Sequence, residues 1–245
     1  MIRIIIYFMK LIVALLVSLF FTSCQFTTGK SVTGSGNITT ETRSVGEFKG
    51  ISVNNALEVE LEQADSFGVT VEADDNLQQY ITTRVENGIL IIETDVNNFK
   101  NVEAKRIKVK MPIISSLEAS SASSIKSVNT LKTEKLLADA SSAAEINIDV
   151  EADDLTCNSS SASSVNVKGK ALKFKTESSS GSDIEAQGLL ANDITAEASS
   201  GSTISLHPIL TLNADASSGG SITYNTVPRD NLTQKADSGG SISKN

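Results

Sequence analysis

Acidic and amide side chains recur about every twenty residues in the second half of the chain, and their type and spacing could support ligand binding. We call this series the acidic ladder; its members are Glu118, Asp139, Asn158, Glu177, Glu197 and Asp215, with Lys235 as the next residue in the series. If successive copies stack as strands, their oxygens lie ~4.8 Å apart along one face. Such a face suits Ca²⁺ or another ligand, or serves as a solvated surface that discourages aggregation.

No residue pattern indicates a catalytic site or a metal site. His207, the single histidine, adjoins Pro208 and has no cysteine or carboxylate in register with it, so the many serines have no base to activate them. A glycosidase needs two carboxylates across a cleft, whereas the acidic ladder follows a flat face without long loops. Arg229 is the only arginine after Arg106, which disfavours a lyase. Calcium-ligand loops are missing from the sequence. We expect no catalytic residue, metal or cofactor.

The acidic ladder belongs to a repeat that occurs seven times after Leu117. Each copy has an apolar residue, a small one, a serine-like pair, Ala or Gly, another small residue, and Ile or Val. The pairs begin at Ser120, Ser141, Ser160, Ser179, Ser199, Ser217 and Asp237, at intervals of 18 to 21 residues. A period of this length is typical of a solenoid, in which each unit buries its apolar side against its neighbours.

Columns of the repeat predict strands on both sides of a tight turn. Numbered from the first residue of each pair, the apolar columns alternate at a spacing of two, which is strand periodicity. Position +5 is always Ile or Val, as in Ile125 and Val165. Position +2 is Ala in the first three copies and glycine in the last four, which are Gly181, Gly201, Gly219 and Gly239. We interpret these as structural turn residues, because a stacked turn leaves little room and glycine permits positive φ.

The sequence therefore predicts an all-β fold, a right-handed parallel β-helix of two facing sheets with coils of about twenty residues. A second, looser turn is expected in each coil, for example at Glu151–Asp154 and Val227–Asp230. Residues 112–245 form this solenoid of seven repeats. Helical repeats are disfavoured because Ser, Thr and Asn crowd each unit and no apolar face recurs at 3.6 residues.

Residues 36–111 are also β-rich, but we find no copy of the repeat in them. Apolar residues alternate around Leu57–Leu61 and Phe67–Val71, and Ile107–Met111 predicts another strand. Asn87-Gly88 lies between two apolar runs and predicts a hairpin. We expect this segment to cover the open end of the solenoid, because a bare end coil is an exposed sheet edge. Gln234, Lys235 and Lys244 predict a polar cap at the other end.

The first residues predict a lipoprotein signal peptide over 1–23. Arg3 and Lys10 precede an apolar run that is too short for a spanning helix, and Thr22-Ser23-Cys24 follows. Cys24 would be the lipidation site, and residues 24–35 a polar tether. A plain secretory signal and a retained membrane anchor stay open, as does a start at Met9 rather than Met1.

Charge and composition limit the partners. Without Arg3 and Lys10, 19 basic residues face 29 acidic ones, which disfavours nucleic acid and anionic headgroups. The chain has no Trp, so an aromatic sugar-binding platform is not expected. Cys157 has no disulfide partner if Cys24 carries lipid, and its column predicts a core position.

With these columns in place, the sequence resembles the bacterial family "putative auto-transporter adhesin, head GIN domain", a domain of unknown function in Bacteroidetes. The resemblance covers Gly46 to Ile242 and rests on Val-Gly-Glu-Phe-Lys-Gly-Ile-Ser-Val (45–53), Val-Glu-Asn-Gly-Ile-Leu-Ile-Ile (85–92) and the repeated Ser-Ser-Gly-Ser turns. It implies a pectin-lyase-like β-helix without catalytic residues and with a suggested role in adhesion.

Three functional hypotheses follow. The first is a non-catalytic, lipid-anchored protein of the cell envelope, most simply at the outer membrane, that binds or adheres through its repetitive surface. Its partners would be the membrane, through the lipid, and a host or matrix protein, a glycan or an envelope protein; nucleic acid is excluded and a homo-oligomer stays open. The second is a structural or sensing accessory of another membrane protein. The third is a degenerate polysaccharide-processing enzyme.

Overall fold

The computed structural model describes residue 10 and residues 30–96 and 98–245, and strands make up most of these residues. The predicted signal peptide apart from residue 10, most of the predicted tether and Cys24 lie outside the described part. Within it, one short 3-10 helix, η1 (Gln78–Tyr80), interrupts the strands. No helix among the described residues is both long and apolar enough to span a membrane.

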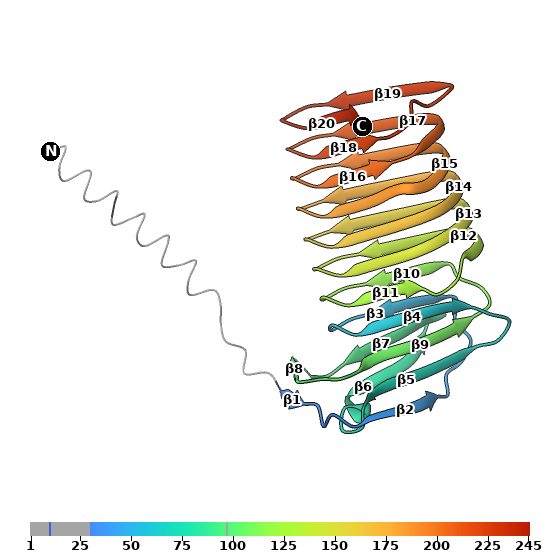
Figure 1. Ribbon diagram of the computed structural model, residues 1–245, viewed down its shortest axis with the longest axis vertical. Helices are drawn as coiled ribbons and strands as arrows, with labels where there is room; N and C mark the ends of the chain where they lie inside the picture. Colours follow the sequence, from blue (N-terminus) through green and yellow to red (C-terminus); the bar gives the residue numbers. More distant parts are fainter. Residues whose placement is uncertain (1–9, 11–29, 97) are drawn as a thin grey trace.

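Beyond residue 111 the strands follow one another as the repeat predicts (Figure 1). They are β10 (Ser116–Ala119), β11 (Ser124–Ser127), β12 (Leu131–Ala140), β13 (Glu145–Ser160), β14 (Ser164–Ser179), β15 (Asp183–Ala198), β16 (Thr203–Leu206), β17 (Pro208–Ala216), β18 (Ser221–Tyr224), β19 (Asn231–Ala236) and β20 (Ser241–Lys244). Each pairs in parallel with the strand one coil away, for example Ile146 with Val165 and Leu155 with Phe174. The predicted β-solenoid with coils of about twenty residues is confirmed.

The second bend differs from the expected turn. β13, β14 and β15 each run for 16 residues through it without a break, so Glu151–Asp154 is strand rather than turn. The pairing continues on both sides, as Ala152 opposite Ala171 and Asp154 opposite Lys173 show. Val227–Asp230 is a loop, as expected. A bend that keeps its interstrand hydrogen bonds needs no turn residues, which explains why the sequence pattern there is weak.

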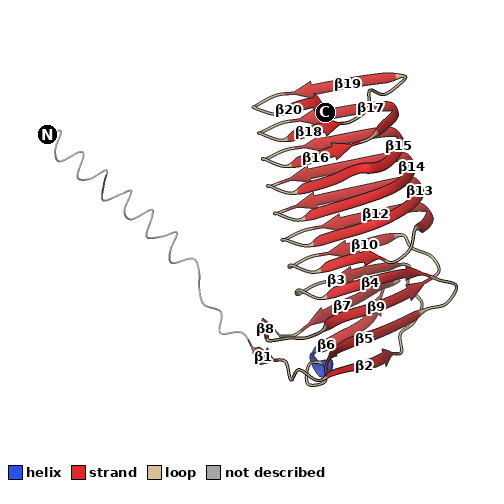
Figure 2. Cartoon of the chain, in the orientation of Figure 1, coloured by secondary structure: helices blue, strands red, loops and turns tan. Residues whose placement is uncertain are grey.

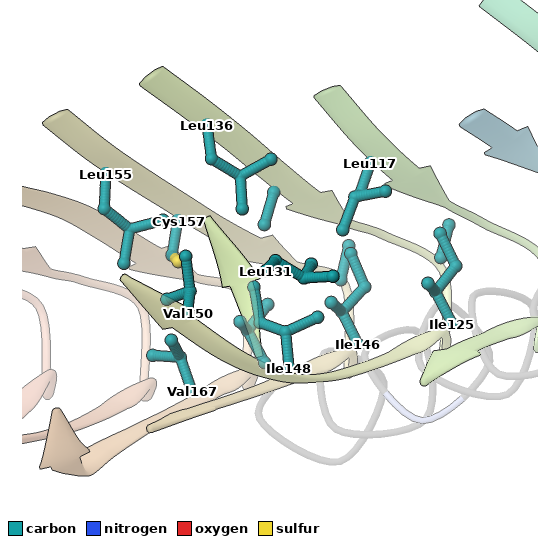
Figure 3. Packing of buried hydrophobic residues seen from close by; sticks show 14 of the residues in the cluster. Leu117, Ile125, Leu131, Leu136, Ile146, Ile148, Val150, Leu155, Cys157 and Val167 are labelled. Atoms are coloured by element: carbon teal, nitrogen blue, oxygen red, sulfur yellow. The ribbon is translucent and has the colours of Figure 1, made fainter. Parts of the chain in front are cut away.

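One apolar core fills the coils. Figure 3 shows Leu117, Leu136 and Leu155, which precede the serine turns, on one side of the core, and Ile125, Ile146, Ile148, Val150 and Val167 on the facing side. The Ile and Val side chains of position +5 are at most 1 % exposed in the first six copies. These columns therefore supply the core, as the sequence predicts. Cys157 is also fully buried there.

The serine turns are two-residue turns with positive φ at both central positions. In the first copy, φ is 54° at Ser121 and 60° at Ala122, and the N–H of Ser123 donates to the carbonyl of Ser120. Positive φ at both positions defines a type I′ turn, which explains glycine at Gly181, Gly201, Gly219 and Gly239. Our steric reason for that column is wrong, since a Cβ built on Gly181 or Gly201 meets nothing within 4 Å.

The crowded position is +3, one residue further along. Ser123, Ser163, Ser182 and Ser202 are at most 2 % exposed there. Each hydroxyl donates to the carbonyl just before the turn of the preceding coil, as Ser163 does to Ala140 at 2.8 Å. Serines of the repeat are therefore not all in outward or exposed positions. This column links neighbouring coils through the edge of the core.

The parallel stack begins inside the predicted cap. Its strands are β1 (Ser31–Thr33), β2 (Ile38–Arg43), β3 (Gly50–Val53), β4 (Glu58–Gln63), β5 (Gly68–Asp74), β6 (Ile81–Glu86), β7 (Ile89–Thr94), β8 (Asn98–Lys100) and β9 (Lys105–Met111). β3 pairs in parallel with β10, and β4 with β11. Asn55 and Ala56, which lie between β3 and β4, have positive φ, like the central residues of the serine turns. The repeat thus has an earlier copy at Asn54–Leu57 that we did not identify from the sequence.

Antiparallel strands then close this end of the stack. β7 and β9 stack in parallel below β3 and β4, although they follow them in the chain. β6 joins β7, and β5 joins β9, both antiparallel, and β2 lies outside β5. The hairpin at Asn87-Gly88 is confirmed, with positive φ at both residues. These strands cover the N-terminal end of the stack.

The other end is less buried. Every residue of β19 is exposed, and Leu232 is 37 % exposed although the residues of its column in the five coils directly before it are buried. Figure 2 shows β19 and β20 as the last strands of the stack, opposite to β1, β2 and β8. Gln234, Lys235 and Lys244 lie in these strands, which is where we expected a polar end.

Candidate functional site

The acidic ladder is aligned by the register of the strands before each serine turn. Consecutive members are Cα partners across every coil, from Glu118 with Asp139 to Asp215 with Lys235. Position −2 alternates with the buried positions −1 and −3, so its side chains point away from the core. The structure thus brings all six predicted ladder residues onto one face.

A long shallow groove runs over this face beside the turns. Its main part has a volume of about 570 Å³ and a further part, which shares Asp139, about 330 Å³. We call both parts together the serine-turn groove. It is lined by ladder residues and by the first serines of the turns, from Ser52 and Asn54 in the cap to Lys235 and Asp237 in the last coil.

Carboxylates in the groove differ in how far they are neutralised. Lys175 Nζ lies 2.7 Å from Glu177 Oε1, and this hydrogen bond raises the pKa of Lys175. Lys235 Nζ lies 2.9 Å from Asp215 Oδ2, which raises the pKa of Lys235 in the same way. Glu118 and Glu197 form no ion pair with any described residue. The groove therefore keeps free hydrogen-bond acceptors between neutralised ones.

Asn158 and the turn serines add groups that can both donate and accept hydrogen bonds. Asn158 Nδ2 donates to Asp139 Oδ2 at 3.3 Å. Ser160, Ser179, Ser199 and Ser217 line the groove at regular intervals, one coil apart. Such a surface can hold a long, polar ligand through many similar contacts, with hydroxyl or amino groups as the best partners for the carboxylates. No three His, Cys, Asp or Glu side chains among the described residues are grouped to hold a metal ion.

A ridge of serines borders the groove, and we did not identify it as a separate feature from the sequence. The second serine of each turn is exposed and has a φ of 47° to 56°; these residues are Ser121, Ser142, Ser161, Ser180, Ser200, Ser218 and Ser238. Type I′ turns favour Asn, Asp or Gly at this position, as at Asn55 in the cap. The sequence signal that could have identified this ridge is the serine at the second position of the pair in all seven copies.

The remaining reactive groups are poorly placed for chemistry. His207 Nδ1 lies 3.3 Å from the carbonyl of Gln187 and 3.2 Å from Nδ2 of Asn225, both on neighbouring coils. Neither neighbour is a carboxylate or a nucleophile. Burial raises the pKa of the Cys157 thiol, which keeps it protonated and unreactive. These surroundings fit a structural role for both residues.

The chain belongs to the family described as "Putative auto-transporter adhesin, head GIN domain", whose model matches residues 47–228. This match begins after β2 of the cap and ends in the loop before β19, so it includes most of the serine-turn groove. It confirms the resemblance found in the sequence.

Solved structures share the fold. A "putative adhesin" from Bacteroides fragilis is 20 % identical with a TM-score of 0.78, covering 87 % of this chain and 99 % of that one. A "putative lipid binding protein" from Parabacteroides distasonis is 21 % identical with a TM-score of 0.71, covering 88 % and 100 %. A "putative adhesin" from Parabacteroides merdae is 17 % identical with a TM-score of 0.70, covering 88 % and 99 %. A search of curated proteins finds no match.

Proposed function

We propose that the chain is a non-catalytic, lipid-anchored module of the cell envelope that binds an extended polar partner through the serine-turn groove. The single observation that carries this proposal is the aligned series of carboxylates, amide and hydroxyls along one open groove. Membership of an adhesin-named family and the adhesin names of two similar structures support it. The right-handed winding, the two facing sheets and the outer-membrane location belong to the same proposal.

Binding fits the groove better than catalysis does. A glycosidase places its two carboxyl groups on opposite sides of the bond to be cleaved. Here the ladder carboxylates all project from one column of one face, at the ~4.8 Å interval of the strands. The groove contains no histidine, and its serines have no activating base among the residues that line it. The arrangement provides many equivalent weak contacts instead of one reactive centre.

The lipid anchor is proposed from Cys24, which lies outside the described residues. Replacing Cys24 by alanine is expected to release the protein from the membrane fraction of the expressing cells. Mass spectrometry of the wild-type protein should find acyl chains on Cys24. An unmodified Cys24 in membrane-associated wild-type protein would contradict the anchor and favour a retained signal segment.

Binding is tested with the protein that lacks its leader, residues 25–245, on an array of glycans and matrix proteins. We expect saturable binding to at least one array member that weakens with added salt, because charged groups line the groove. Digestion of intact cells with an added protease tells where the partner is. Protection of the protein would contradict surface adhesion and support a role with another envelope protein.

A further inference from the structure

The segment between the proposed lipid site and the fold is short, because the chain joins the cap at residue 30, within the predicted tether of residues 24–35. β1 pairs in parallel with β8, with Val32 opposite Phe99, and both side chains pack against the core. Lys30 Nζ lies 4.1 Å from the centre of the Tyr80 ring and 3.7 Å from Asp95 Oδ2. Thus residues 30–33 of the predicted tether form part of the folded cap.

A buried carboxylate holds the next residues of the chain. Asp74 is fully buried and accepts hydrogen bonds from the N–H of Gly36 at 2.9 Å and of Glu103 and Ala104 at 3.1 Å. A Cβ on Gly34 would lie 2.3 Å from an oxygen of Asp74, so only glycine lets the chain pass this close. These contacts join the chain after β1 to the loop after β8.

Covalent geometry then limits how far the fold can lie from Cys24. Six residue steps separate Cys24 from Lys30, and at about 3.5 Å per residue they span at most ~21 Å in any conformation. Among the described residues, eight parallel pairings join nine strand segments from β7 to β19. At 4.8 Å per step the stack rises about 38 Å above β7.

We propose that the foot of the cap, made of β1, β8 and residues 34–37, faces the lipid bilayer. The parallel stack then extends away from the membrane, with β19 and β20 farthest from it. Figure 1 shows β1 and β8 at the end of the stack opposite to β19 and β20. This inference rests on the proposed lipid anchor at Cys24. It places the serine-turn groove along the direction that leads away from the bilayer.

Surface charge supports this orientation over one in which the stack lies on the bilayer. Glu118 and Glu197 have no cationic partner among the described residues, so the groove face would meet anionic headgroups unfavourably. The foot carries the exposed Lys100 of β8, and Lys30 lies directly before β1. The other face that could contact lipid is the second bend, where Leu172 is 52 % and Leu190 is 41 % exposed around a hollow of about 610 Å³. Contact through that bend is the competing outcome.

Energy transfer from labelled cysteines to acceptors in the bilayer tests the orientation. The full-length, lipid-modified protein is placed in vesicles of phosphatidylcholine that contain a headgroup acceptor, with one label at Lys100→Cys, Leu190→Cys or Ser238→Cys. Buried Cys157 does not compete for the label. We expect the highest transfer efficiency from position 100 and the lowest from position 238. Equal efficiency from positions 100 and 238, or the highest efficiency from position 190, would overturn the proposal.

A lengthened tether provides the second measurement. Twenty Gly and Ser residues inserted between Thr27 and Thr28 should reduce the difference between positions 100 and 238, because the fold can then turn over at the membrane. An unchanged difference would show that the short connection does not set the orientation. Flotation with the vesicles separates the two proposals: protein that does not float contradicts the anchor itself, whereas floating protein with position 238 near the bilayer contradicts only the orientation.

Discussion

The two ends of the parallel stack are built in different ways. At the N-terminal end, β5, β6 and β2 add antiparallel strands, and the buried Asp74 carboxylate at the end of β5 holds the segments at Gly36 and at residues 103–104 through partly buried hydrogen bonds. At the other end, β19 is exposed along its whole length and Leu232 is only partly covered. The same type of coil is therefore closed by extra structure at one end and by polar residues at the other.

Because of this difference, we expect local stability to fall from the cap toward the last coil. Coils in a solenoid are stabilised mainly by their neighbours, and the last coil has only one. β19 pairs with β17 on one side, and the backbone groups on its other side have no partner strand among the described residues. We expect amide hydrogen exchange to be slowest near the cap and the middle coils and fastest in β19 and β20. Four predictions test this comparison.

Replacing Asp74 by alanine should have the largest effect. It removes the buried carboxylate that accepts hydrogen bonds from the N–H groups of Gly36, Glu103 and Ala104, so the loss should be about 3 kcal/mol of unfolding free energy. Thermal or urea unfolding measures this loss. Asp193→Ala is the matched control, since Asp193 accepts one hydrogen bond, from Thr211 at 2.8 Å, on an exposed surface. Equal losses in both variants would contradict the role of Asp74 in closing the stack.

Alanine at Leu212 and at Leu232 compares the same column in neighbouring coils. Leu212 is fully buried, whereas its Cα partner Leu232 is 37 % exposed. Leu212→Ala should cost about 2–4 kcal/mol, and Leu232→Ala less than about 1 kcal/mol. Urea unfolding of both variants gives the two values. If Leu232→Ala were as costly as Leu212→Ala, the last coil would be better buried than the structure shows, for instance by a second copy of the chain.

Adjacent glycines in one turn test which position is crowded. A Cβ on Gly220 would lie 2.4 Å from the carbonyl oxygen of Ala198, whereas Gly219 has only one atom within 4 Å, at 3.9 Å. Gly220→Ala should therefore cost about 2 kcal/mol. Gly219→Ala should cost about 1 kcal/mol, from its positive φ alone. The midpoints of thermal unfolding measure both. If Gly219→Ala lost more stability than Gly220→Ala, the steric constraint would lie at position +2 and not at position +3.

The pH dependence of stability should be smaller and should come partly from the cap. Burial of Asp74 opposes its ionisation, but the N–H donors outweigh it, so the pKa of Asp74 lies below its ordinary value. The stabilisation is therefore complete above the unfolded pKa of about 3.9 and is lost as the pH falls toward the folded pKa. Unfolding of the wild type and Asp74→Asn between pH 7 and 2 measures it. A variant with the same acid slope as the wild type would contradict this assignment.

Much of the fold could be predicted from the sequence because stacked coils must repeat their columns. Ile125 and Val165 identified the core, and the interval of the serine pairs identified the alignment of Glu177 with Glu197. The copy at Asn54 was missed because β5 to β9 separate it from Ser120, and because Asn replaces serine at its first two positions and Leu at its last. The order of the strands in the sequence also does not show that β7 lies below β3, because β4, β5 and β6 lie between these two strands in the chain.

Other features depended on contacts that the sequence does not reveal. Gly201 and Ser202 are both small and both read as turn residues in the sequence. Only the structure shows that position +2 is open and position +3 is buried. Residues 30–37 have the composition of a linker, yet Asp74 and the strand β8 hold them. In the groove, spacing predicted the carboxylates, but not which of them Lys175 and Lys235 neutralise.

Two variants with equal changes in charge test whether this protein binds through the serine-turn groove. One variant carries Asp139→Asn, Glu177→Gln, Glu197→Gln and Asp215→Asn in the groove. The other carries Glu145→Gln, Asp149→Asn, Asp183→Asn and Glu185→Gln on strands beyond the turns. Both are measured against the array member that the wild type binds best. We predict that the groove variant loses at least tenfold in affinity and that the other keeps wild-type affinity. Equal affinities for the two variants would contradict the claim.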